Sequence, residues 1–142
     1  AYAAVASELI QELFAMYDVD RKVFDTVVNY SKQIRRRNVQ LGMIMLGWQL
    51  LSLAGVVPSA NAFSHQDGIE PFWIQVKDTT NLSISRSVKA GLPHILAYQW
   101  GEDTPIELPK TIWKELEKLL FAYCEQEIGK PLQSVKFLNS II

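Results

Sequence analysis

The hydrophobic positions of the chain form one nearly continuous apolar run, with periodic stretches on both sides of it. The run is Val39–Val57, and no Asp, Glu, Lys or Arg occurs between Arg37 and Asp67. Gln40 and Gln49 would point to opposite sides of a helix, so such a helix has no polar face. A helix that is apolar all round is either the buried centre of a domain or a membrane span.

We weigh three interpretations of this run. As a membrane span it has about the required length, with Lys32 and Arg35–Arg37 on the cytoplasmic side. As an export signal it has a basic start, a pair of arginines and the small-residue run Ser59–Ala62. As the core helix of a globular domain it would be covered by its neighbours. We expect the core helix. The glycines, glutamines and serine in the run make it a poor membrane span, and an export signal would not follow some 35 residues of amphipathic sequence.

Two amphipathic helices are predicted before the apolar run. The first extends from Ser7, a suitable N-cap, to about Tyr17, with apolar residues at the i, i+3, i+4 spacing. The second extends over about residues 21–36 and has one apolar and one basic side. The basic residues here are Arg21, Lys22, Lys32, Arg35, Arg36 and Arg37. Such a face contacts phosphates or anionic lipids, but it is also typical of a solvated surface.

The period changes after Glu70. Apolar and polar positions alternate over residues 72–77 and again over 82–88, and Asp78–Asn81 between them is typical of a turn. We therefore predict an antiparallel hairpin, which forms a small sheet over about residues 70–100. His94–Trp100 is either a third strand of this sheet or a short helix, and we favour the strand. The sheet must pack on the helices, because an isolated hairpin is marginally stable.

The last third of the chain predicts a long amphipathic helix and an apolar tail. The helix extends over about residues 108–128, with Gly129 as its C′ residue and Pro131 preventing continuation. The tail ends in Ile141 and Ile142, which we expect either to enter the core or to contact a neighbouring subunit. The fold class predicted is α+β and mostly helical, a single domain over 1–142 with its helical half at 1–58.

Composition adds little to this pattern. The chain has 142 residues, a formal net charge of −1 and 49% hydrophobic residues, so no overall positive field recruits nucleic acid. Its single cysteine, Cys124, excludes an intrachain disulfide and is compatible with a reducing compartment, which favours the cytoplasm.

Candidate chemistry is sparse. His65, Asp67 and Glu70 are close in sequence, but their spacing matches no established metal site. His94 follows a proline and is expected at the surface, and Cys124 is expected in the core. No catalytic, cofactor-binding or metal-binding residue is assigned.

We interpret the chain as a non-enzymatic interaction or assembly protein that associates with itself. The residues expected at the protein interface are Trp73, Trp100, Phe137, Leu138, Ile141 and Ile142. Two alternatives stay open. One is a coat-like structural protein that binds nucleic acid through the basic face of residues 21–37, and the other is a single-span membrane protein with 39–57 in the bilayer.

Overall fold

The computed structural model describes residues 2–16, 21–33, 39–63, 69–100 and 108–141. This part of the chain is helical and contains no strand. The helices, in order, are α1 (Tyr2–Met16), α2 (Arg21–Gln33), α3 (Val39–Leu53), α4 (Ala60–Phe63), α5 (Ile69–Thr80), α6 (Arg86–Ala97), α7 (Lys110–Ile128) and α8 (Gln133–Ile141).

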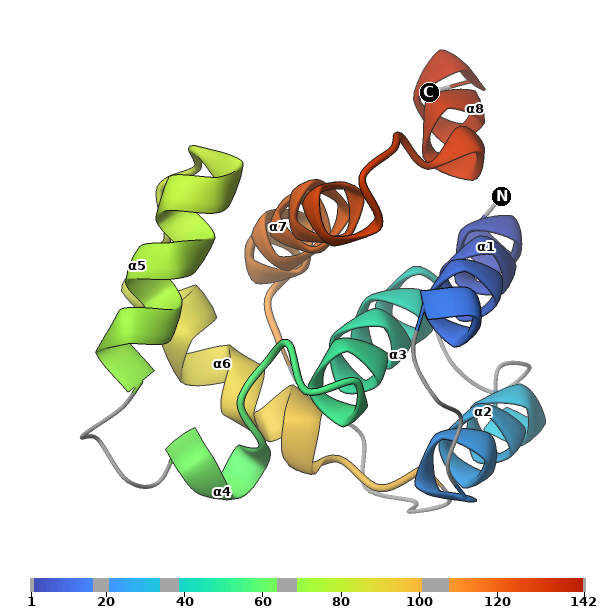
Figure 1. The fold of residues 1–142 in the computed structure, drawn as a ribbon, viewed down its shortest axis with the longest axis horizontal. Coiled ribbons are helices and arrows are strands. Elements are labelled where there is room, and N and C mark those ends of the chain that lie inside the picture. The colour runs from blue at the N-terminus through green and yellow to red at the C-terminus, as the bar shows by residue number, and fades with distance from the viewer. Residues whose placement is uncertain (1, 17–20, 34–38, 64–68, 101–107, 142) are drawn as a thin grey trace.

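Helix α3 is the centre of the molecule, and α1, α2, α6 and α7 pack around it (Figure 1). Every residue from Gly42 to Leu51 is buried. Gly47 allows α7 to approach closely, since a Cβ at this position would lie 2.6 Å from Cδ2 of Leu120. The prediction that the apolar run forms the buried centre is confirmed.

None of the helices in the described ranges is both long enough and apolar enough to cross a bilayer. Helix α3 also ends at Leu53, before the predicted end at Val57. Gly55 adopts a left-handed φ of 86° and turns the chain. The N–H groups of Val56 and Val57 then donate to the Leu51 carbonyl at 3.1 and 3.3 Å.

The predicted β-sheet is wrong, because residues 69–80 and 86–97 are helices α5 and α6. In the first segment Phe72, Trp73 and Val76 are buried whereas Ile74 is 54% exposed. Positions 72 and 76 fit a helical period as well as an alternating one, so a short apolar run does not distinguish a helix from a strand. Pro71, in the first turn of α5, was the local signal for a helix start.

Helix α6 shows the same ambiguity. Its buried residues, Val88, Gly91, Leu92 and Ile95, follow the i, i+3, i+4, i+7 spacing. The serines that suggested an alternating strand include its N-cap, Ser85, whose Oγ accepts from the N–H of Val88 at 3.2 Å. The segment favoured as a third strand is helical up to Ala97, and Pro93 lies inside α6.

The two ends of the chain meet at one side of the molecule, where α1 packs against α8 (Figure 1). Helix α1 begins at Tyr2, so Ser7 lies within it instead of capping it. Helix α7 ends as predicted, with Gly129 in the left-handed conformation at φ 83°. The tail forms α8, and its Val135 and Leu138 join the core.

Candidate nucleic-acid interface

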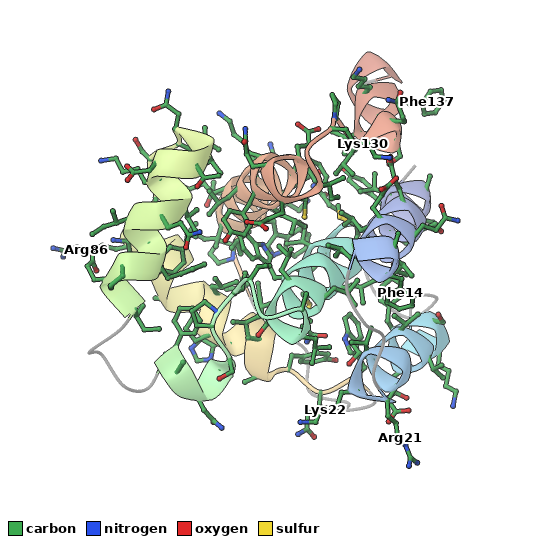
Figure 2. All side chains as sticks on the ribbon, in the orientation of Figure 1. Phe14, Arg21, Lys22, Arg86, Lys130 and Phe137 are labelled. Atoms are coloured by element: carbon green, nitrogen blue, oxygen red, sulfur yellow. The ribbon has the colours of Figure 1, made fainter. Side chains whose placement is uncertain are left out.

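The described part of the basic face lies on α2. Val23 and Tyr30 anchor this helix in the core, at 7% and 4% exposure. On the other side Arg21, Lys22 and Lys32 are exposed, and Figure 2 shows Arg21 and Lys22 pointing away from the body of the protein. Arg35, Arg36 and Arg37 lie outside the described residues.

Arg21 is only weakly neutralised by its neighbour on the helix. Its Nε lies 3.9 Å from Oδ2 of Asp25, with the two side chains 94% and 58% exposed. An exposed pair of this kind contributes little free energy, so the guanidinium can exchange its partner for a phosphate. The exposed face of α2 therefore offers three cationic groups to an anionic ligand.

Beside this face lies a cavity of about 600 Å³, which we call the α2–α6 cavity. Helix α2 contributes Lys22, Asp25 and Asn29 to its wall, and the segment after α6 contributes Tyr98, Gln99 and Trp100. The end of α3 and the start of α4 complete the lining. Lys22 thus belongs both to the basic face and to the cavity.

A buried hydrogen-bond network shapes the wall of the cavity. Gln49 is only 6% exposed. Its Nε2 donates to the carbonyls of Ile95 and Tyr98 at 3.0 and 2.9 Å, and its Oε1 accepts from Nε1 of Trp100 at 2.5 Å. These bonds satisfy the amide of Gln49 and fix the chain where it leaves α6.

Aromatic side chains surround the same network. The Trp100 ring lies 5.3 Å from the rings of both Tyr30 and Tyr98, edge-on in each case. Burial raises the pKa of Tyr30 to about 12, so its phenol stays neutral at physiological pH. The sequence signal for this arrangement was a glutamine within an otherwise apolar helix, because a buried amide needs partners.

The residues predicted at a protein interface are separated by the fold. Trp73 and Trp100 lie in the core at 4% and 9% exposure, and Leu138 is also buried. Phe137 is 62% exposed and points away from α8 (Figure 2). Nothing is described of the Ile141 side chain or of Ile142.

The candidate metal ligands and Cys124 do not form a reactive site in the described part of the chain. Within the described ranges, His, Cys, Asp and Glu form no group that could hold a metal ion. Glu70 instead lies 3.9 Å from Nζ of Lys89, and His65 and Asp67 fall outside those ranges. Cys124 is completely buried, and this burial, with the nearby carboxylates of Glu127 and Glu125, raises the pKa of its thiol.

Comparison with known proteins links the chain to one family. The family described as "Recombination protein O C terminal" matches residues 1–136, which is nearly the whole chain. No curated protein and no solved structure matches it significantly.

Proposed function

Because the chain belongs to the Recombination protein O C terminal family, we propose that it is a non-enzymatic component of DNA recombination that binds nucleic acid through α2. The basic face of α2 supplies the contacts to the phosphate backbone. The observation that supports this proposal is that Arg21, Lys22 and Lys32 are exposed on a helix whose opposite side is buried in the core.

The charge distribution determines how such binding behaves. The whole chain has a formal net charge of −1, so attraction depends on the local face and not on a field of the entire molecule. Each cation that neutralises a phosphate releases a counterion, and log K falls with log salt by about 0.9 per contact on duplex DNA. We expect a moderate affinity that weakens steeply as salt is added.

Fluorescence anisotropy with a labelled duplex, measured over a series of salt concentrations, tests the proposal. Lys22→Ala and Lys32→Ala are each expected to weaken binding several-fold and to reduce the salt slope by about one. Lys77→Ala removes a lysine that is also exposed, on α5, and is the matched control. Binding that ignores salt, or that all three variants weaken equally, would contradict a phosphate-binding role for α2.

The predicted contribution of Arg35, Arg36 and Arg37 needs its own variant. Replacing all three by alanine is expected to reduce the salt slope further, because they are half of the six basic residues that form the predicted face. An unchanged slope in this triple variant would restrict the interface to the described residues of α2.

Self-association through α8 is a second candidate function. Phe137 exposes 62% of its surface, and aromatic side chains are enriched at the centres of protein interfaces. The partner proposed is a second copy of this chain. Light scattering of the purified protein is expected to give a mass above that of the monomer, reduced by Phe137→Ser, and a monomer mass for the unchanged protein would eliminate this candidate.

A further inference from the structure

We propose that the α2–α6 cavity accepts an unpaired nucleobase, so that the α2 interface prefers single-stranded to duplex nucleic acid. This inference rests on the proposed function, because α2 must first hold the backbone. The cavity has the volume of a small-ligand site, about 600 Å³. It also begins where the basic face ends, since Lys22 belongs to both.

The charges at the cavity decide which part of a nucleotide enters. Asp25 lines the wall, and its carboxylate would repel a phosphate placed inside. The same carboxylate can accept a hydrogen bond from the exocyclic amino group of a base. Lys22 and Arg21, which are exposed on the same helix, can hold the phosphates outside. A base inside and a backbone outside is therefore the orientation that the charges favour.

The remaining wall chemistry suits the edge and the face of a base. Asn29 and Gln99 each present an amide, which both donates and accepts, and no hydrogen bond among the described residues uses either amide. Tyr98 and Trp100 add aromatic surface to the wall. Proteins that recognise single strands combine aromatic surfaces with hydrogen bonds to base edges that are free of a complementary strand.

The cavity is held open before any ligand arrives. Gln49 links Trp100 and the carbonyls of Ile95 and Tyr98 through three hydrogen bonds, so the segment after α6 is fixed relative to α3. Both N–H groups of the Gln49 amide are used by these two carbonyls, so Gln49 does not bind the base itself. We assign it a positioning role. A preformed site loses little free energy to ordering on binding.

A base within a duplex cannot use this site. Its Watson–Crick edge is already paired and its faces are stacked, so extracting it carries the cost of unpairing and unstacking. Duplex DNA therefore reports only on the phosphate contacts of α2, whereas a single strand reports on those contacts and on the cavity. Comparing the two ligands separates this inference from the proposed function.

The experiment measures the affinity of the chain for an oligodeoxycytidine strand, whose bases carry an exocyclic amino group, and for a duplex of equal length at one salt concentration. The unchanged protein is expected to bind the strand about ten-fold more tightly. Asn29→Phe fills the cavity and is expected to remove this preference while leaving duplex affinity unchanged. Ser31→Phe adds the same ring at an exposed position of α2 that does not line the cavity, and it should retain the preference.

Gln99→Ala provides an independent test, since Gln99 is exposed and lies outside the helices. It is expected to weaken single-strand binding about three-fold without changing the melting temperature or the duplex affinity. Equal affinity of the unchanged protein for both ligands, or a preference that survives Asn29→Phe, would overturn the cavity assignment while α2 remains a phosphate-binding face. Absence of binding to either ligand would overturn both proposals.

Discussion

Glu8 and Ser134 join the first helix to the last. The carboxylate oxygen Oε1 of Glu8 accepts from the N–H of Ser134 at 2.9 Å and from its hydroxyl at 2.5 Å. Oε2 of the same carboxylate accepts from the N–H of Gln133 at 2.9 Å. A side chain of α1 therefore caps the N-terminus of α8, where free N–H groups favour a negative charge.

This cap predicts a loss of stability at acid pH. Burial alone raises the pKa of Glu8, but the hydrogen bonds from Ser134 and Gln133 and the charge of Lys130 bring it below its ordinary value of 4.5. A carboxyl whose pKa is lower in the folded than in the unfolded protein stabilises the fold at pH values above its unfolded-state pKa. This stability is lost as the pH falls through its folded-state pKa. Glu8→Gln should reduce the free energy of unfolding by about 1 kcal/mol at neutral pH.

Urea denaturation between neutral pH and pH values below 4.5 checks this prediction. The difference between the unchanged protein and Glu8→Gln should shrink as the pH falls through that range. A difference that stays constant with pH would mean that the charge of Glu8 does not contribute to the cap.

Gly47 is expected to tolerate no side chain. The Cβ of Gly47→Ala would lie 2.6 Å from Leu120 Cδ2, and Leu120 is fully buried between helices. We expect the free energy of unfolding to fall by about 1–3 kcal/mol. Gly42→Ala is the matched control in the same helix, because its Cβ would meet only Tyr30 Cε2 at an ordinary 3.5 Å. Since alanine favours helix over glycine, the control should be neutral or stabilising by up to about 1 kcal/mol.

Two buried tyrosines are expected to respond differently when the hydroxyl is removed. The Tyr30 hydroxyl is buried without a hydrogen-bond partner among the described residues, whereas that of Tyr123 donates to the Val56 carbonyl at 3.0 Å. Tyr30→Phe should leave the free energy of unfolding unchanged or raise it by about 1 kcal/mol. Tyr123→Phe should lower it by a similar amount. Thermal unfolding of the two variants provides the comparison, and destabilisation by Tyr30→Phe would indicate an unseen partner for its hydroxyl.

Gln49→Leu is expected to be among the costly substitutions in α3 despite adding an apolar side chain to an apolar helix. It leaves the Nε1 of Trp100 and two carbonyls without their partner, at a cost of about 1–3 kcal/mol for a buried donor. Gln40→Leu is the comparison, because Gln40 donates to Oε2 of Glu117 at 2.6 Å in a half-buried position where water can replace it. Chemical denaturation should rank Gln49→Leu below Gln40→Leu in stability.

Cys124 should be unreactive in the folded protein. Its side chain is inaccessible and burial raises the pKa of its thiol, so little thiolate forms near neutral pH. Ellman's reagent is expected to give almost no signal under native conditions and one thiol per chain after unfolding in guanidinium. Rapid reaction of the native protein would contradict the position of Cys124 in the core.

The sequence was informative where a pattern was long or chemically specific. The burial of α3 was predictable because residues on every side of this helix are apolar. The end of α7 was predictable because Gly129 readily adopts the left-handed conformation that ends a helix. Helices α5 and α6 have only 12 residues each. Over so few residues, the apolar positions fit a strand and a helix alike, and Asn81, read as a turn residue, is the left-handed position that follows α5.

The candidate site was predictable only in part. Arg21, Lys22 and Lys32 share one helix face, so the helical period alone places them together. The α2–α6 cavity combines residues as distant as Asn29 and Gln99, which only the packing of α2 against α3 and of α3 against α6 brings near each other. The local sequence does not predict such packing. Its one indication is Gln49, a polar residue in an apolar helix whose amide needs hydrogen-bond partners from elsewhere in the chain.

The capping of α8 by Glu8 also has a consequence for the order in which the protein is made. Ser134 is separated from Glu8 by 126 positions, so the ribosome must synthesise the whole segment between them before the two residues can meet. Until then the nascent first helix lacks its final neighbour, and its outer surface is open to chaperones or to other nascent chains. Completion of this fold is therefore a late closure between two segments that leave the ribosome far apart in time.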